Sequence, residues 1–156
     1  MTPCIKLLKK HHKTYTIHQY KHENSWSSYG EEAATKLGVE QKRVFKTLVV
    51  QTDKQTLGVG VVPVSSKLSL KAMAKALDAK KVAMADAKDV QIATGYVLGG
   101  VSPLGQKKRL QIVIDASAKS YETIFVSAGK RGLEVELSPD DLQELSGAVF
   151  ESIQEN

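Results

Sequence analysis

The sequence predicts an α+β fold built on a mixed, largely antiparallel sheet. Two pairs of segments with apolar residues at alternate positions are separated by short turns, as in hairpins: 44–52 with 56–62, and 123–127 with 133–137. Segments with helical spacing lie among the strands, but they lack the strict β-α-β alternation of a parallel sheet. The length suits a single core, and we expect residues 1–156 to form one domain.

Five helices are predicted from residues that can cap a helix N-terminus and that precede apolar residues at helical spacing. These caps are Thr2, Ser28, Ser69, Asp86 and Ser138. Gly38 and Gly95 stand where two of the helices should end, because glycine readily adopts the left-handed conformation found there. The predicted helices span 2–12, 28–38, 70–77, 87–93 and 138–145.

The remaining segments predict further strands and one long loop. Alternating apolar residues indicate strands at 14–20, 81–85, 110–114 and 148–153. Residues 95–109 (GYVLGGVSPLGQKKR) are rich in glycine and follow neither the helical nor the strand period. We expect a functional loop there, with a short strand at 96–98.

Charge and cysteine content narrow the class of protein. Lys and Arg number 22 against 17 Asp and Glu, and the net charge of +5 is compatible with a polyanionic partner such as RNA. The single cysteine, Cys4, excludes an intrachain disulfide and a zinc–thiolate cluster. The N-terminal apolar stretch is too short for a signal peptide, and no run is long enough to cross a membrane. We therefore expect a cytoplasmic protein that is not associated with membranes.

Several familiar catalytic motifs are missing. The sequence has no Gly-x-Ser-x-Gly elbow, no P-loop and no Gly-x-Gly-x-x-Gly after a strand. His18 and His22 are four apart on a strand that runs into a loop, so this spacing does not gather them on one helical face. We predict neither a metal site nor a cofactor. Cys4 lies on the apolar side of the first helix and is better interpreted as a core residue than as a nucleophile.

Lys46 occupies an unusual position in the predicted strand 44–52. Alternation places it on one face with Val44, Leu48 and Val50, which are all aliphatic. Burying an unpaired ammonium group is costly, so such a lysine needs a carboxylate, backbone carbonyls or an anionic ligand as its partner. The alternative is that its side chain extends from the strand to water. Spacing alone does not choose between the two.

The glycine-rich loop and two basic clusters are candidate binding elements. Gly99 and Gly100 would let the backbone approach a ligand closely, and their amides could hold a carbonyl oxygen or a phosphate. They could equally form a tight connection. Two groups of cations could bind phosphates or simply be solvated surface: Lys107, Lys108 and Arg109 in one, and Lys130 and Arg131 in the other.

Several segments together resemble the YbaK/EbsC family of aminoacyl-tRNA editing proteins. The resemblance runs over essentially the whole chain. The most specific stretch is TGYVLGGVSPLGQKKRL at 94–110, and it occurs together with VFKTLVV at 44–50 and FVSAGKRGLEVELSPDDL at 125–142. The similarity is greatest to the free-standing deacylases that act on Cys-tRNA(Pro), which share a domain with bacterial prolyl-tRNA synthetases.

This resemblance implies a fold, a substrate and a mechanism. The sheet is expected to be partly closed into a barrel with helices around it. The implied substrate is Cys-tRNA(Pro), with Cys-tRNA(Cys) as a further option, because cysteine and proline are too similar in volume for one pocket to separate. The substrate's own thiol is expected to attack its ester and to release a thiolactone. The enzyme would then be a deacylase, formally a hydrolase or, if the thiolactone is the product, a lyase.

The resemblance also assigns roles to individual residues. Lys46 corresponds to the active-site lysine of the family, and Gly99 with Gly100 to the backbone wall that polarises the carbonyl. The expected substrate-binding residues are Tyr20, Thr47, Ser127 and Glu134. Relatives often carry Asp at the position of Glu134, so its reach differs by one methylene. The side chain of Thr47 is expected to point away from that of Lys46 unless the strand bulges.

Two rival functions remain open from the sequence. One is the editing of another aminoacyl-tRNA, such as Ala-tRNA(Pro). The other is a non-catalytic module that binds RNA or a synthetase. Because the domain is small, we expect tRNA selection to depend partly on a partner, for which prolyl-tRNA synthetase is the natural choice.

Overall fold

The computed structural model describes residues 1–26 and 28–156. Its helices are α1 (Pro3–Lys10), α2 (Tyr29–Leu37), α3 (Leu70–Ala76), α4 (Ala87–Thr94) and α5 (Pro139–Ser146), with 3-10 turns at Gln41–Arg43 and Ala116–Ser120. Its strands are β1 (Thr16–Gln19), β2 (Phe45–Thr52), β3 (Leu57–Pro63), β4 (Val82–Met84), β5 (Gln111–Asp115), β6 (Ile124–Lys130), β7 (Leu133–Leu137) and β8 (Val149–Glu151). The predicted α+β class is therefore confirmed.

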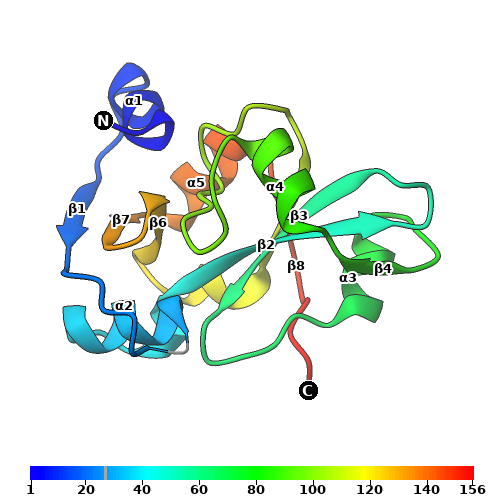
Figure 1. The fold of residues 1–156 in the computed structure, drawn as a ribbon, viewed down its shortest axis with the longest axis horizontal. Helices are drawn as coiled ribbons and strands as arrows, with labels where there is room; N and C mark the ends of the chain where they lie inside the picture. Colours follow the sequence, from blue (N-terminus) through cyan, green and yellow to red (C-terminus); the bar gives the residue numbers. More distant parts are fainter. Residues whose placement is uncertain (27) are drawn as a thin grey trace.

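The strands form two sheets that meet at the start of β2 (Figure 1). The smaller sheet has the order β1-β7-β6 and is antiparallel, and the larger has the order β4-β2-β3-β5-β8. In the larger sheet, β2 pairs antiparallel with β3 and β4, whereas β5 is parallel to β3 and to β8. A single parallel bridge between Val44 and Phe125 links the two sheets. The sheet is thus mixed and largely antiparallel, but strand pairing in residues 1–26 and 28–156 does not close a barrel.

Helix ends follow the predicted capping chemistry in most places. Ser28, Ser69 and Ser138 each accept a backbone N–H three residues on, and Gly38 ends α2 in the left-handed conformation. Asp86 precedes α4 as predicted, but its side chain makes no capping hydrogen bond among the described residues. The first helix stops at Lys10, two residues early, because His12 has a φ of 54° that a right-handed helix cannot continue.

Two further boundaries differ from the sequence prediction. Residues 96–98 form no strand: Tyr96 is held in the core by its hydroxyl, which donates to the Leu104 carbonyl, while Val97 and Leu98 project to solvent. The last strand spans three residues only, although Ile153 beyond it is buried.

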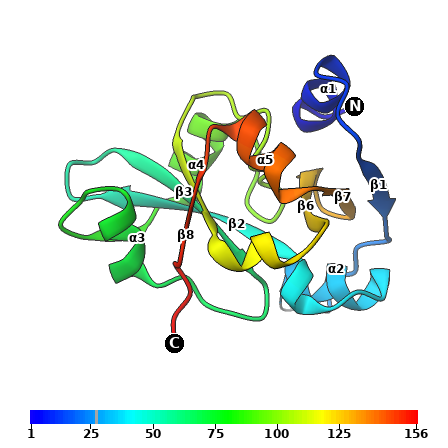
Figure 2. The ribbon, with the colours of Figure 1, turned by 180° about the vertical axis from the view of Figure 1, so that it is seen from behind.

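The core lies between the sheets and the helices that cover them. The largest apolar cluster joins Cys4 and Leu8 of α1, side chains of both sheets, and Leu142 of α5, which lies in front of the sheets in the view of Figure 2. A second cluster packs Met73 of α3 against the larger sheet, and a third lies under α2. Each fully buried large aliphatic side chain contributes about 1.5–3 kcal/mol to folding. In the part of the chain described, no helix combines the length and apolar character needed to cross a bilayer.

Candidate active site

A cavity of about 460 Å³ opens where the two sheets meet. It brings together six of the seven residues predicted for catalysis and substrate binding: Tyr20, Lys46, Thr47, Gly99, Ser127 and Glu134. They come from β2, β6, β7, the segment after β1 and the glycine-rich loop. The first turn of α2 and apolar side chains complete the lining, with Ser28, Tyr29, Gly30, Val44, Phe45, Leu48, Leu98 and Val101.

The first half of β2 contributes adjacent residues to the cavity because one of its edges is free. Phe45 to Leu48 pair with β3 on one side, whereas β4 pairs only with Val50–Thr52 on the other. Thr47 therefore lines the same cavity as Lys46, although the register with β3 is continuous and shows no bulge. Thr47 contributes to the lining, but its hydroxyl is buried, as expected if its side chain points away from that of Lys46.

Lys46 is a half-buried cation without an ion-pair partner among the described residues. Burial lowers the pKa of its ammonium group below the usual 10.5, and the positive charge of Lys67 acts in the same direction. The carboxylate of Glu31 partly opposes this shift in pKa. Because no protein carboxylate within reach neutralises it, the ammonium group is available to an electron-rich atom of a ligand.

Glu134 is a buried carboxyl group in the lining of the cavity. It lies on β7, directly across from Ser127 of β6 and His18 of β1. Glu134 is 7% exposed, and burial raises the pKa of its carboxyl group from 4.5 to about 8. At neutral pH the carboxyl group is therefore mostly protonated and can donate a hydrogen bond, whereas an ordinary glutamate is ionised at this pH.

We expect this protonation to appear in the pH dependence of stability. Between pH 4.5 and 8 the folded chain keeps a proton on Glu134 that the unfolded chain has lost, so stability falls as pH rises through this window. Relative to Glu134→Gln, the wild-type protein should lose up to about 1.4 kcal/mol per pH unit there. Thermal unfolding of both proteins at pH 5, 6, 7 and 8 measures the divergence.

Glu136→Gln is the matched control. Hydrogen bonds from Thr123 and His18 lower the pKa of the Glu136 carboxyl, so its contribution is present above the usual pKa of a glutamate and is lost as pH falls, opposite in direction to that of Glu134. Parallel curves for wild type and Glu134→Gln would show that Glu134 is ionised in the folded protein.

The hydroxyl groups of the cavity differ in their hydrogen bonding. Thr47 Oγ1 is buried and has no hydrogen-bond partner in the part of the chain that the structure describes. Ser127 Oγ accepts the Gly129 N–H at 3.1 Å, and Ser28 Oγ accepts the Glu31 N–H at 3.4 Å. Burial raises the pKa of Tyr20 to about 12, so its phenol stays neutral. An unpartnered buried hydroxyl is costly, so Thr47 Oγ1 is a local source of destabilisation in the wall of the cavity.

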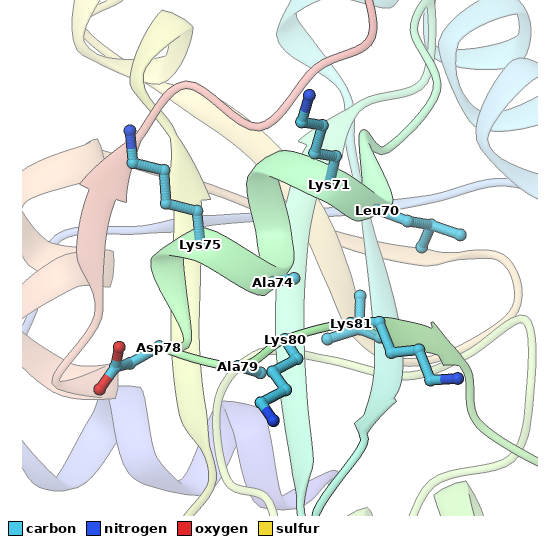
Figure 3. Close-up of a pocket in the computed structure, with 9 residues that line it drawn as sticks. Leu70, Lys71, Ala74, Lys75, Asp78, Ala79, Lys80 and Lys81 are labelled. Atoms are coloured by element: carbon cyan, nitrogen blue, oxygen red, sulfur yellow. The ribbon is translucent and has the colours of Figure 1, made fainter.

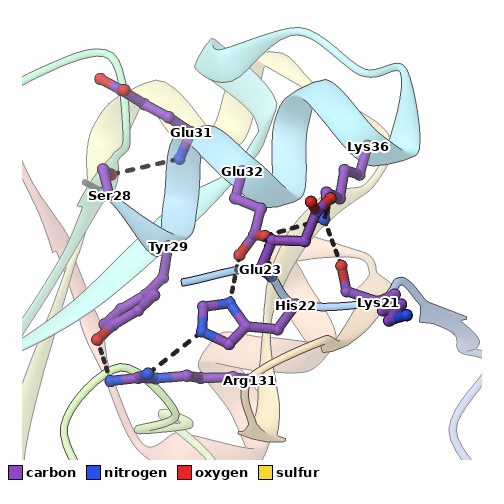
Figure 4. Close-up of polar contacts among 9 residues, drawn as sticks. All are labelled: Lys21, His22, Glu23, Ser28, Tyr29, Glu31, Glu32, Lys36 and Arg131. Atoms are coloured by element: carbon purple, nitrogen blue, oxygen red, sulfur yellow. Dashed lines mark hydrogen bonds and ion pairs between the residues drawn. The ribbon is translucent and has the colours of Figure 1, made fainter. Parts of the chain in front are cut away.

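Arg131 and Tyr29 form a stacked pair beside the cavity (Figure 4). The guanidinium carbon lies 3.8 Å from the centre of the Tyr29 ring, and the guanidinium also donates to the Tyr29 hydroxyl. Arg131 lies 3.3 Å from His22 Nε2, and His22 Nδ1 lies 2.6 Å from Glu32. Because arginine only donates, His22 Nε2 must accept, and Nδ1–H then donates to Glu32. The buried Glu32 thus fixes the ring that orients Arg131.

Gly99 is packed too closely for any other residue. Its φ is 89°, and an added Cβ would lie 2.4 Å from Cε2 of Tyr29 and 2.8 Å from Nε of Arg131. Its N–H has no partner among the described residues, and Gly99 lines the cavity. The stacked pair and the glycine together hold one backbone amide at the site.

Gly100 has a different role from the one predicted. It does not line the cavity, and its N–H already donates to the Val97 carbonyl at 3.0 Å. An added Cβ would lie 2.9 Å from Cα of Lys130, so the glycine allows the loop to pack on the β6–β7 turn. Of the two predicted amides, only that of Gly99 is left for a ligand.

Comparison with known proteins identifies the family. The family model described as "Aminoacyl-tRNA editing domain" matches residues 23–145. The chain belongs to the aminoacyl-tRNA editing domain family. Its activity class is therefore aminoacyl-tRNA deacylation, and its substrate includes a tRNA.

Individual relatives show similarity in sequence or in fold. The chain is 38% identical over 155 residues to an Enterococcus faecalis protein named "Putative Cys-tRNA(Pro)/Cys-tRNA(Cys) deacylase EbsC", covering 97% of this chain and 92% of that one. It is 29% identical over 116 residues to the uncharacterized YwhH of Bacillus subtilis, covering 74% and 73%. A solved structure described as "a putative trans-editing enzyme for prolyl tRNA synthetase" has the same fold, with a TM-score of 0.84, 21% identity and coverage of 100% and 99%.

The predicted tRNA-binding cations of this editing domain lie in two places relative to the cavity. Arg131 lies beside the cavity in the stacked pair, and Lys130 is exposed at the end of β6. Lys107, Lys108 and Arg109 are exposed along two other depressions that share no lining residue with the cavity. Their backbone is anchored by the N–H groups of Lys107 and Lys108, which donate to carbonyls at the end of α4.

Sequence reasoning missed the contribution of α2 to the candidate site. Tyr29 and Gly30 line the cavity, and Glu32 supports Arg131 through His22. One signal was present: glycine is a poor helix former, yet Gly30 stands in the first turn of α2. An added Cβ there would lie 2.1 Å from Cγ1 of Val64, so the glycine lets α2 sit against the residue that follows β3.

Proposed function

We propose that this protein removes cysteine from mischarged Cys-tRNA(Pro), with Cys-tRNA(Cys) as a second substrate, by attack of the substrate's own thiol on its ester. The observation that carries the proposal is the chemistry of the cavity lining. A cation, a protonated carboxyl group and hydroxyl groups surround a space of about 460 Å³. The full-length similarity to a protein named as a Cys-tRNA deacylase supports the same substrate.

The protein offers no activated nucleophile of its own among the described residues, and this supports the substrate-thiol route. The chain's one cysteine, Cys4, is fully buried in the core, and burial raises the pKa of its thiol to about 11. Thr47, Ser28 and Ser127 line the cavity, but none is hydrogen-bonded to a histidine or lysine in the part of the chain described. A serine or threonine nucleophile needs such a base. The substrate thiol needs none from the protein.

The reaction on this proposal conserves atoms and charge at each step. The cysteinyl sulfur, as thiolate, attacks the ester carbonyl carbon, and a C–S bond forms. The bond between that carbon and the ribose oxygen then breaks, and the released oxygen takes up a proton to give the free tRNA terminus. The four-membered thiolactone that leaves is opened by water to cysteine.

The cavity residues would stabilise charge and hold the reacting groups. The Lys46 ammonium and the Gly99 N–H are placed to stabilise the negative charge that develops on the carbonyl oxygen. Protonated Glu134 is an O–H donor and can supply the proton to the departing ribose oxygen. These roles require no metal or cofactor.

A second enzyme is implied by the substrate. Cys-tRNA(Pro) forms when a synthetase accepts cysteine in place of the similarly sized proline, and an editing step then restores accuracy. The chain would encounter Cys-tRNA(Pro) in the cytoplasm, and prolyl-tRNA synthetase is the partner that can transfer the mischarged tRNA to it.

A panel of charged tRNAs tests the proposal. We expect rapid release of cysteine from Cys-tRNA(Pro) and Cys-tRNA(Cys), and rates at least about 10²-fold lower for Ala-tRNA(Pro) and Pro-tRNA(Pro), which lack the thiol. Release of the labelled amino acid is followed under single-turnover conditions. Preference for Ala-tRNA(Pro) would identify another editing specificity, and binding without release would identify a non-catalytic module.

A further inference from the structure

A groove of about 470 Å³ lies between α3 and β4, apart from the editing cavity (Figure 3). The two share no lining residue. Four lysines line it: Lys71 and Lys75 on α3, and Lys80 and Lys81 just before β4. We call it the lysine groove.

The cations of the lysine groove are exposed and unneutralised. All four side chains belong to exposed residues, and none forms an ion pair within residues 1–26 and 28–156, whereas Lys13 and Lys36 elsewhere do. Asp78 is the acidic residue in the lining. The nearby Asp53 is engaged in accepting the Lys80 backbone N–H at 3.1 Å. The groove thus carries an excess of positive charge that favours a polyanion.

The floor of the lysine groove cannot read a sequence of bases. It is formed by Ala74, Ala79 and Val82, which offer no side-chain donor or acceptor. Flexible ammonium groups around an apolar floor suit repeated phosphates, which carry no sequence information. A ligand recognised by its base edges would need polar side chains that the groove lacks.

The position of the lysine groove relative to the cavity fits a long substrate. β4 pairs with Val50–Thr52 at one end of β2, and Lys46 lies near the other end. Thr52 lies six residue steps along the strand from Lys46, a distance of about 20 Å. Lys67 belongs to the connection from β3 to α3, and its charge acts on Lys46. An aminoacylated nucleoside in the cavity cannot span this distance, whereas the body of a tRNA can.

We propose that the lysine groove binds the phosphate backbone of the tRNA while the aminoacylated end occupies the cavity. This inference rests on the proposed function for the identity of the RNA. It places the RNA-binding surface at α3 and β4 in addition to the cations beside the cavity, and it makes groove binding independent of base sequence.

Charge removal in the groove tests the proposal with two substrates. The groove variant replaces Lys71, Lys75, Lys80 and Lys81 by glutamine, and the control variant makes the same change at four exposed lysines on α1 and α4: Lys6, Lys9, Lys10 and Lys88. A third variant replaces Lys107, Lys108 and Arg109. Binding of labelled, uncharged tRNA(Pro) is measured by fluorescence anisotropy over a range of salt concentrations, and cleavage of cysteinyl-adenosine is measured in parallel.

We expect the groove variant to bind tRNA at least about tenfold more weakly at low salt, and the dependence of log Kd on log salt to flatten by about 0.9 for each lost duplex contact. Its rate on cysteinyl-adenosine should stay within about twofold of wild type, because 20 Å exceeds the Debye length at physiological salt. The control variant should bind tRNA more tightly than the groove variant.

Other results overturn the inference separately from the function. Unchanged tRNA affinity and salt dependence in the groove variant would show that the lysine groove does not bind the RNA. If the salt dependence flattens in the third variant alone, the RNA contacts lie at Lys107–Arg109. Loss of binding to prolyl-tRNA synthetase with unchanged tRNA binding would make the groove a protein interface. Wild-type protein that binds tRNA but leaves cysteinyl esters intact rejects the proposed function and leaves the groove standing.

Discussion

Replacing Lys46 by alanine is expected to reduce deacylation by about 10²- to 10³-fold while the fold survives. The ammonium group lines the cavity, is half-buried and has no ion-pair partner in the described residues, so its charge is directed at the ligand. Its loss removes stabilisation of the developing oxyanion. It should not destabilise the protein, because an unpaired half-buried cation favours the unfolded chain. Single-turnover cleavage of Cys-tRNA(Pro) and circular dichroism are measured together.

Lys67→Ala is the matched control for this experiment. Lys67 is exposed and influences Lys46 only through its charge, so its removal should change the rate by less than about tenfold. A folded Lys46→Ala protein with a near-normal rate would show that Lys46 only fills space at the strand edge, and oxyanion stabilisation would have to come from elsewhere in the cavity.

The elements of this fold were predictable because their signals are local. Alternation placed the hairpin of β2 and β3 to within a residue, and serine caps placed the starts of three helices. The short strand expected at 96–98 failed because a tertiary contact decides that segment: Tyr96 is held by the Leu104 carbonyl. Local periodicity carries no information on such a contact.

The site was predictable in its residues and less so in its geometry. Lys46 was conspicuous as a cation among aliphatic neighbours, and the cavity does contain it. Alternation also predicted that the Thr47 side chain points away from that of Lys46, and its buried hydroxyl agrees with this, but alternation did not predict that a cavity lies beside this part of β2. The stacking of Arg131 on Tyr29 joins residues about a hundred positions apart, and no spacing rule relates them.

The arrangement of the two sheets likewise depends on contacts between segments that are distant in the sequence. Which strands pair was deducible for hairpins, because a short turn leaves few choices. The single bridge from Val44 to Phe125, which positions the cavity, depends on how the sheets pack. The barrel closure implied by family resemblance is not confirmed by the strand pairing.

Serine and cysteine esters of the same tRNA should differ sharply as substrates. The two amino acids have nearly the same shape, so the cavity should bind both. A thiol is partly ionised at neutral pH and is intrinsically far more nucleophilic than a hydroxyl. Held beside its own ester, it reacts in an intramolecular step, for which effective molarities of about 10⁵ M or more are known. We therefore expect Ser-tRNA(Pro) to be cleaved more slowly by on the order of 10² or more.

Cys4→Ala separates the substrate's thiol from the protein's own. Cys4 is fully buried in the core and does not line the cavity, so the variant should keep its preference for the cysteine ester and a rate within about twofold of wild type. Single-turnover cleavage of both esters by both proteins is the measurement. Equal rates for the serine and cysteine esters would indicate attack by water, since water does not depend on the substrate's side chain. A loss of activity in a folded Cys4→Ala protein would instead make the protein thiol the nucleophile, which its burial and its pKa of about 11 oppose.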